Sequence, residues 1–307
     1  MKNYEFVVSE EYDSQRIDRY LAELMPDCSR TFIQKLIKDS NVLLNDDAPK
    51  SSCKLVNGDR VSITVPDAVI PDICPENIPI DIVYEDDDLL IVNKPKGMVV
   101  HPAPGHYSGT LVNAIMYHCH DLSGINGMMR PGIVHRIDMN TTGLLIICKN
   151  DKCHNSIAEQ LKEHSIERTY YAICSGGFSE NEGTIDKNIG RNPSDRKKMA
   201  INPGGKHAVT HYKVLGTNKG FSFIKCNLET GRTHQIRVHM ASIGHPLLGD
   251  DVYGGDTKSF KTLGQTLHAG TIGFIHPSTG KRIQIESELP GYFKDILKSL
   301  ELIDLMC

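Results

Sequence analysis

The spacing of apolar residues divides most of the chain into many short strands and a few helices. Apolar runs typical of strands occur at residues 82–83, 89–92, 144–148, 169–174, 207–215, 221–228, 271–276 and 282–286. Apolar residues recur at helical spacing over residues 151–164, 233–243 and 292–305. Because strands outnumber helices, the pattern favours an α+β fold with a mostly antiparallel sheet.

A smaller α+β unit precedes these elements. Asp13 or Ser14 is expected to cap a first helix, and Ser29 is expected to cap a second helix over residues 30–39. Short strands are expected at residues 42–44 and 61–65. On the second helix the apolar residues share one face, which leaves three basic side chains on the other: Arg30, Lys35 and Lys38.

Four prolines between residues 66 and 79 indicate an extended segment between the two parts. The expected organisation is therefore a small domain at residues 14–70, a linker at 71–79 and a large domain at 80–300.

Composition excludes several classes of protein. The chain of 307 residues has no apolar run near the ~20 residues needed to cross a membrane, and residues 1–15 lack the apolar core of a signal peptide. We therefore expect a cytoplasmic protein. Its net charge of -4 argues against a nonspecific polyanion binder, although local basic clusters can still bind phosphates.

The nine cysteines include no Cys-x-x-Cys pair, and Cys148, Cys174 and Cys226 lie in apolar runs, which indicates buried reduced thiols. The cluster at residues 118–120, His-Cys-His, lacks a second ligand pair at zinc spacing, so no metal site is expected.

Residues 131–143, PGIVHRIDMNTTG, concentrate an imidazole, a cation and a carboxylate before a buried strand. Burying charge there is costly unless the charge is used or paired, so Asp138 is a candidate for chemistry. From the residues alone, Asp138 could equally cap the turn through Asn140 and Thr141.

Four blocks occur in an order that resembles one family: residues 93–97, 131–143, 168–172 and 231–240, the last continuing through 244–250. The chain resembles pseudouridine synthases of the RluA/RluC/RluD type, the large-subunit-rRNA type, over roughly residues 80 to 295. This resemblance implies isomerisation of uridine to pseudouridine in RNA, most of all in large-subunit (23S) rRNA or ribosome-assembly intermediates. It implies no cofactor, and the chain has neither a G-x-G-x-x-G fingerprint nor a P-loop. A monomer is expected.

The small domain resembles an S4 RNA-binding module through its Ser29-Arg30-Thr31 helix start and the turn at residues 54–59. The resemblance implies that Arg30, Lys35 and Lys38 contact RNA. Composition alone favours an ordinary solvated helix face, because acids are about as frequent as bases in this unit.

The resemblance also implies the roles of the catalytic residues. Asp138 is the reacting carboxylate, and Arg237 is the cation that keeps it ionised, with Arg232 as a rival that more naturally contacts phosphate. Tyr170 is expected to stack on uracil, while Tyr171, one residue along a strand, faces the other way unless the register slips by one. Whether Asp138 attacks covalently or assists glycal formation stays open.

The target base must be flipped out of folded RNA, which suits Arg136 as the side chain that fills the vacated stack. His135 is expected to orient this RNA-facing loop. Arg196 and Lys197 belong to a basic loop at residues 191–198 that resembles an RNA-facing loop of the family.

Two other functions compete with this interpretation. A non-catalytic RNA-binding protein would need no intact set of Asp138, Tyr170 and Arg237. A metal-dependent hydrolase would use His135, Asp138, His234 and His239, but these residues do not form a His-x-x-x-His pair with a carboxylate base.

Overall fold

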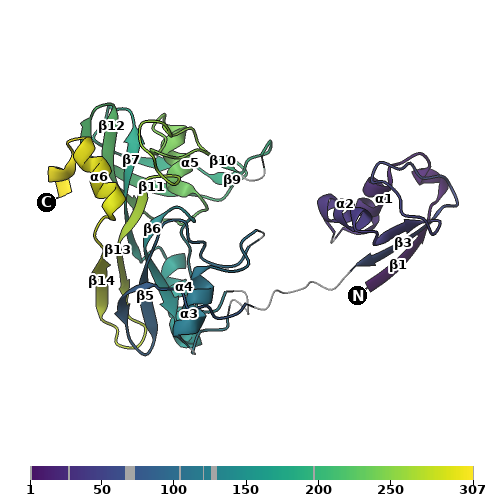
Figure 1. Cartoon of the computed structure of the whole chain (residues 1–307), viewed down its shortest axis with the longest axis horizontal. Helices are drawn as coiled ribbons and strands as arrows, with labels where there is room; N and C mark the ends of the chain where they lie inside the picture. The colour runs from purple at the N-terminus through teal and green to yellow at the C-terminus, as the bar shows by residue number, and fades with distance from the viewer. Residues whose placement is uncertain are drawn as a thin grey trace. The chain divides into compact units, whose positions relative to one another are not determined.

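The computed structural model describes residues 2–26, 28–65, 73–103, 105–119, 121–125, 130–195 and 198–306. The chain divides into two compact units, residues 1–71 and residues 72–307 (Figure 1). Each unit has its own sheet and its own apolar core.

The smaller unit packs two helices on a three-stranded sheet with the order β1-β3-β2, in which both pairings are antiparallel. Its elements are β1 (Lys2–Val7), the 3-10 turn η1 (Glu10–Tyr12), α1 (Ile17–Leu24), α2 (Arg30–Lys38), β2 (Val42–Leu44) and β3 (Arg60–Val65). The core forms between Ile17, Tyr20 and Leu21 of α1 and Ile33 and Leu36 of α2, all nearly inaccessible to water.

Ser29 caps α2 as predicted, because its hydroxyl accepts the backbone N–H of Phe32 at 3.2 Å. The predicted cap of the first helix is wrong. Arg16 occupies the N-cap position, and Asp13 instead accepts the backbone N–H of Asn57 at 3.0 Å. Strand β1 was not expected, since its side chains are almost all exposed and so leave no clear apolar alternation.

The larger unit is built on a nine-stranded sheet with the order β4-β5-β6-β13-β7-β12-β11-β8, and β14 pairs with β13. The strands are β4 (Asp81–Glu85), β5 (Leu89–Lys94), β6 (Thr142–Cys148), β7 (Glu167–Ser175), β8 (Glu182–Asp186), β11 (Val209–Asn218), β12 (Phe221–Leu228), β13 (Leu267–Ile275) and β14 (Arg282–Glu286). All pairings of these strands are antiparallel except β6 with β13, which confirms the predicted fold class. Strands β9 (Ile189–Arg191) and β10 (Met199–Ile201) form a separate hairpin.

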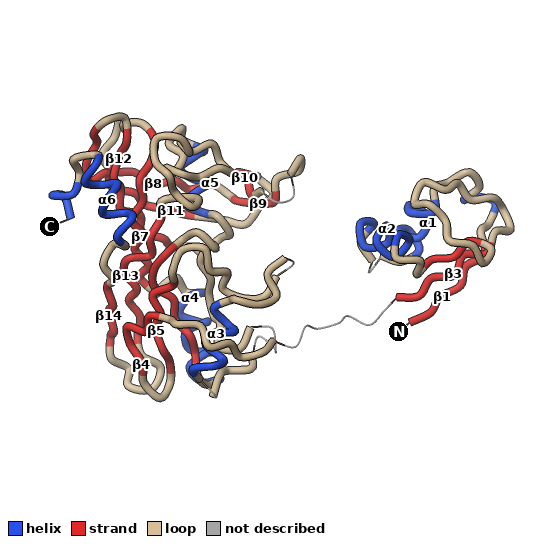
Figure 2. The backbone as a smooth tube through the Cα atoms, viewed as in Figure 1, coloured by secondary structure: helices blue, strands red, loops and turns tan. Residues whose placement is uncertain are grey.

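Helices cover both faces of this sheet (Figures 1 and 2). They are α3 (Leu111–His118), α4 (Asp151–Lys162), α5 (Gln235–Ser242) and α6 (Gly291–Ser299), followed by the 3-10 turn η2 (Ile303–Met306). Alternate residues of β6 belong to different apolar clusters: Leu145 and Ile147 to the cluster that includes α3 and α5, and Leu144 and Ile146 to the cluster that includes α4. On the side of the sheet opposite α5, α6 covers β7 and β12.

Several boundaries differ from the pattern-based expectation. The last helix ends at Ser299 instead of residue 305, because the chain turns at Glu301 with a φ of 56°. Strand β13 begins at Leu267, four residues early, and α5 begins at Gln235. Helix α3 and the strands β8, β9 and β10 were not predicted.

The first two residues of the predicted linker, 71 and 72, lie outside the described part of the chain. The remainder packs on the larger unit: Ile73 is buried in its core, and the side-chain amide of Asn113 donates to the carbonyl of Cys74 at 2.9 Å. The backbone N–H of Gly109 donates to the carboxylate of Glu76. Residues 73, 74 and 76 therefore make contacts within the larger unit.

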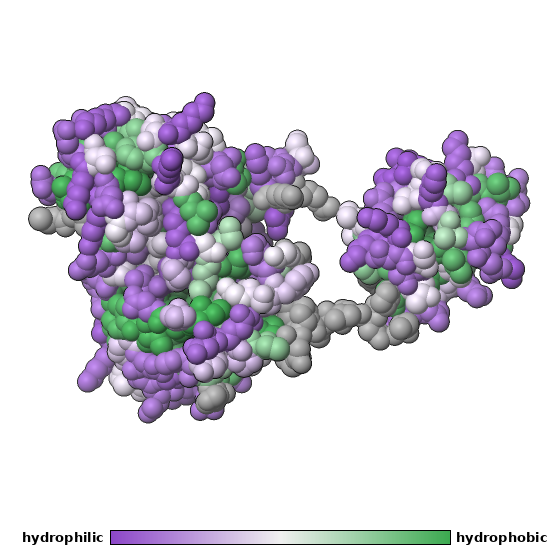
Figure 3. Space-filling model, viewed as in Figure 1, coloured by the Kyte–Doolittle hydropathy of each residue, from purple (hydrophilic) through white to green (hydrophobic). Residues whose placement is uncertain are grey.

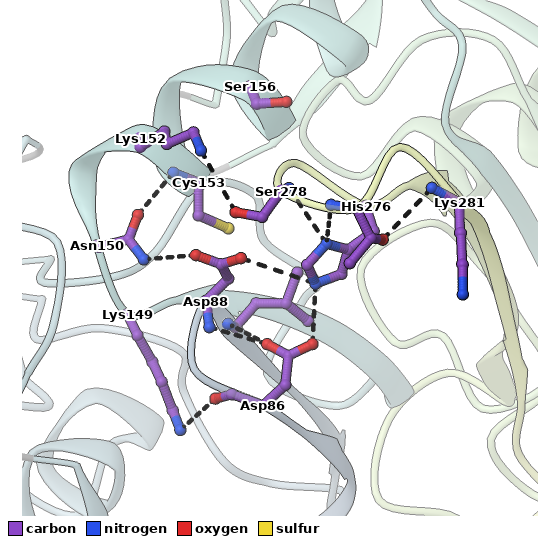
Figure 4. A network of polar contacts seen from close by, with 12 residues as sticks. Asp86, Asp88, Lys149, Asn150, Lys152, Cys153, Ser156, His276, Ser278 and Lys281 are labelled. Atoms are coloured by element: carbon purple, nitrogen blue, oxygen red, sulfur yellow. Dashed lines mark hydrogen bonds and ion pairs between the residues drawn. The ribbon is translucent and has the colours of Figure 1, made fainter.

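A polar network ties three loops together at the β4–β5 end of the sheet (Figure 4). Nε2 of His276 lies 2.8 Å from Asp86, and its Nδ1 accepts the backbone N–H of Ser278. The side-chain amide of Asn150 donates to Asp88 in the same network. These bonds join the β4–β5 turn, the start of α4 and the β13–β14 turn.

Cys148, Cys174 and Cys226 are buried free thiols, as predicted. Polar side chains cover most of the smaller unit in the view of Figure 3, and an apolar band crosses the near face of the larger unit. Among the described residues, no helix combines the length and apolar character needed to cross a bilayer.

Candidate active site

A cleft of about 780 Å³ opens on the face of the larger sheet that α5 covers. Its wall comes from the loop before β6, from β7 and from the start of α5, and it includes Asp138, Tyr170 and Arg237. Three segments far apart in the sequence therefore supply the three predicted catalytic residues to one cavity.

The Asp138 loop is fixed from two sides. Nε2 of His135 accepts the backbone N–H of Ile146 in β6 at 3.0 Å, and burial lowers the pKa of His135 to about 3. The fully buried ammonium of Lys94 donates to three backbone carbonyls, among them that of Met139 at 2.9 Å. His135 and Lys94 thus tie the Asp138 loop to β6 and to the segment after β5.

Gly143 allows the loop to enter β6 beside β13. Its φ of 110° is unfavourable for other residues, and a Cβ atom there would lie 2.2 Å from the carbonyl oxygen of Ala269. This close approach of two backbones explains the glycine that ends the motif.

The Asp138 side chain does not cap the turn that follows it. Its backbone carbonyl accepts the N–H of Thr141 at 3.0 Å, whereas its carboxylate oxygen Oδ2 accepts Nη1 of Arg237 at 3.0 Å. Arg232, the rival cation, donates to the carbonyl of His207 instead. Of the two arginines, Arg237 is the partner of Asp138.

Arg237 is held in turn by Asp250, which was not among the residues predicted from the sequence. Its Nε and Nη2 donate to the two oxygens of Asp250 at 2.7 and 2.9 Å, a fork geometry that fits carboxylates well. Burial opposes the charge on Arg237, but the hydrogen bonds to Asp250 and the field of Asp138 outweigh it and raise its pKa. Asp250 is the last residue of the family-like block at residues 244–250, and its place in that block was the sequence signal that could have identified it.

Tyr170 and Tyr171 face opposite sides of β7, as predicted. Tyr170 lines the cleft. Burial raises the pKa of its hydroxyl, which favours the protonated, neutral phenol. Tyr171 packs against Phe223 on the other face, with ring centroids 5.9 Å apart.

Arginines line the cleft around Asp138. Arg136 is exposed, and its guanidinium lies 3.4 Å from Nε2 of His101. Arg168 is buried beside Arg232, and its Nη2 donates to the carbonyl of Glu229 at 2.8 Å. These cations give the cleft the character of a site for an anionic ligand.

The remaining predicted RNA contacts lie elsewhere. Lys35 and Lys38 are exposed on α2, while Arg30 is committed to the fully buried Asp18 through two hydrogen bonds of 3.0 and 2.7 Å. Arg196 and Lys197 lie outside the described residues.

The metal-hydrolase alternative finds no support in this geometry. His239 is buried, and its two ring nitrogens contact Thr210 and the carbonyl of Lys187. Within the described ranges, the group of side chains close enough to share a metal ion is Glu85, His118 and Cys119, and Glu85 already binds the ammonium of Lys149 at 2.6 Å.

The fold and the cleft define an α+β protein in which a carboxylate, held by a buried arginine, lies in a cleft lined by further arginines. The sequence model of the family described as RNA pseudouridylate synthase matches residues 88–242. The chain belongs to this family and is an RNA pseudouridine synthase.

Individual proteins similar to this chain carry the same family description. The RNA pseudouridine synthase YlyB of Bacillus subtilis is 50% identical over 98% of this chain and 99% of its own. Ribosomal large subunit pseudouridine synthase D of Zymomonas mobilis is 45% identical over 98% of both chains. The solved structure of human RNA pseudouridylate synthase domain containing 1 covers 73% of this chain and 95% of its own with a TM-score of 0.57, which at 24% identity shows a shared fold.

Proposed function

We propose that this enzyme isomerises uridines of large-subunit (23S) rRNA, with Asp138 as the reacting carboxylate. The observation that carries the proposal is the ion pair of Asp138 with Arg237 inside a cleft lined by arginines. The target class rests on the relatives named for the large ribosomal subunit, at 43 to 45% identity.

The reaction breaks the N1–C1′ bond of uridine, turns the detached uracil and forms a C5–C1′ bond. The proton on C5 is then lost and N1 gains a proton, so that the product is an isomer of uridine. A carboxylate beside C1′ or C6 assists this step, either as a nucleophile or by removing a proton on the route to a glycal. Arg237 keeps that carboxylate ionised when RNA excludes water from the cleft. Tyr170 supports the uracil ring by stacking during its rotation.

RNA enters the cleft as a flipped-out nucleotide. Arg136 stands exposed beside Asp138 in the sequence and has a planar guanidinium that can replace the flipped base in its stack. The smaller unit acts as an S4-like RNA-binding module through Lys35 and Lys38 on the exposed side of α2.

The test combines one variant with one mapping experiment. Pseudouridines are mapped in 23S rRNA from a strain lacking the gene, complemented with wild type or with Asp138→Asn. We expect at least one 23S position to need the wild-type chain and to stay uridine with the variant. If every 23S pseudouridine is still present without the gene, 23S rRNA is not the target. If Asp138→Asn restores the missing pseudouridine, Asp138 is not the reacting carboxylate.

A further inference from the structure

His234 lies on the side of Asp138 that Arg237 leaves open. Arg237 donates to Oδ2 of Asp138 at 3.0 Å, whereas Nε2 of His234 lies 3.9 Å from Oδ1. The two cleft-lining side chains therefore face different oxygens of one carboxylate. At 3.9 Å there is no hydrogen bond yet, but such contacts in free enzymes commonly shorten when substrate binds.

The contact with Tyr253 favours one tautomer of the His234 ring. The hydroxyl oxygen of Tyr253 lies 2.7 Å from Nδ1 of His234 and already accepts the backbone N–H of Met199 at 2.9 Å. Since that oxygen already accepts one N–H, its O–H is free to donate to Nδ1, and this is the tautomer that we assign. The ring proton then lies on Nε2, the nitrogen that faces Asp138. Burial lowers the pKa of His234, which favours this neutral ring.

The backbone at His234 gives an independent reason to expect a function. His234 precedes α5 with a φ of 56°, a left-handed conformation that asparagine or glycine adopts more readily. Its side chain makes no capping hydrogen bond to the helix. Helix capping therefore does not explain an imidazole here, and strained residues of this kind gather at functional sites.

We propose that His234 is a positioning residue for Asp138: a neutral imidazole, held by Tyr253 as the Nε2–H tautomer, that donates to Oδ1 of Asp138 when RNA closes the cleft. Arg237 and His234 then hold one carboxylate oxygen each, which keeps Asp138 ionised and oriented once water is excluded. This inference rests on the proposed role of Asp138 and adds a second donor to it.

The discriminating experiment compares His234→Gln with His234→Asn in the full chain. The amide nitrogen of glutamine reaches approximately where Nε2 lies, whereas that of asparagine ends near Nδ1 and cannot reach Asp138. Asparagine suits the left-handed backbone better, so a purely structural role favours it. The readout is the single-turnover rate at saturating 23S rRNA transcript, with RNA affinity and thermal unfolding measured in parallel.

We expect His234→Gln to stay within about fivefold of wild type and His234→Asn to lose about 100-fold in rate, with RNA affinity little changed. Tyr253→Phe should slow the rate as well, and its combination with His234→Asn should be no slower than His234→Asn alone. His211→Asn, outside the cleft lining, is the matched control.

The assignment of His234 is overturned if His234→Asn is as active as His234→Gln. It is also overturned if the rate losses of Tyr253→Phe and His234→Asn add up in the double variant. Asp138→Asn is measured in the same assay. If that variant keeps its activity, the proposed role of Asp138 falls and this inference falls with it; if it is inactive while His234→Asn is active, the His234 assignment alone falls.

Discussion

At the scale of single residues, Arg237 divides its donors between two carboxylates in different surroundings. Asp250 is fully buried and also accepts the backbone N–H groups of Val252 and Tyr253, whereas the Asp138 side chain is 22% exposed to the cleft. Asp250 therefore fixes the guanidinium, and the guanidinium in turn fixes Asp138, the carboxylate that we propose to react with the substrate.

Replacing Arg237 by alanine tests this arrangement. The change leaves the carboxylate of Asp250 buried without its cation, which typically costs about 3–5 kcal/mol of unfolding free energy. We expect Arg237→Ala to lose that much in urea denaturation and to be inactive on every RNA. Arg232→Ala is the control, since its guanidinium donates to a backbone carbonyl, and it should unfold within about 1 kcal/mol of wild type. Equal stability of both variants argues against Asp250 as the anchor.

Arg136 predicts a different kinetic pattern because it is proposed to act on the RNA and not on the carboxylate. Arg136→Ala should be slow on a substrate whose target uridine is stacked, and should recover when a mismatch loosens that uridine, since flipping then costs less. Rates on the two RNAs are compared for Arg136→Ala and Arg237→Ala. Equal recovery of both variants contradicts this separation of roles.

At the scale of secondary-structure elements, Asp18 joins the two helices of the smaller unit. It lies on α1 with a fully buried carboxylate, and it accepts hydrogen bonds from Arg30 and Gln34 of α2 and from Arg16. Burial raises the pKa of Asp18, but these hydrogen bonds outweigh it and lower the pKa to about 2. Arg30 thus stabilises the helix pair, which reduces its freedom to contact RNA.

This ion pair predicts a pH dependence. A carboxylate with a depressed pKa stabilises the folded state above its unfolded value near 4, and the gain is lost as the pH falls toward 2. The stability difference between wild type and Asp18→Asn should therefore shrink by about 1–2 kcal/mol over that window, the half-exposed arginines being screened by water. Hydrogen exchange of the α1 and α2 amides measures this, and a difference independent of pH contradicts it.

At the scale of the whole molecule, the smaller unit is expected to add phosphate contacts to those of the cleft. Lys35→Ala with Lys38→Ala should weaken rRNA binding, and the slope of log affinity against log salt should become shallower by about 1 for each phosphate that the variant no longer binds. Lys298→Ala, exposed on α6, is the matched control. An unchanged affinity and salt slope show that these lysines do not bind RNA.

The sequence by itself determined which helices and strands form wherever apolar residues recur at a regular spacing along the chain. The strand run at residues 144–148 and the cap of α2 by Ser29 depend on neighbours in the sequence, so local pattern is sufficient for them. Strand β1 and the hairpin of β9 and β10 are short or exposed and carry no such pattern. The family motifs likewise marked Asp138, Tyr170 and Arg237 without any geometry.

Only the tertiary structure decided which of these residues meet. Asp138 and Arg237 are 99 positions apart, so their contact depends on how α5 packs over the sheet. The same packing gives Arg237 its anchor in Asp250 and sets His234 between Tyr253 and Asp138. Hydrogen-bond geometry and shared burial are properties of the folded cavity, and no spacing along the chain encodes them.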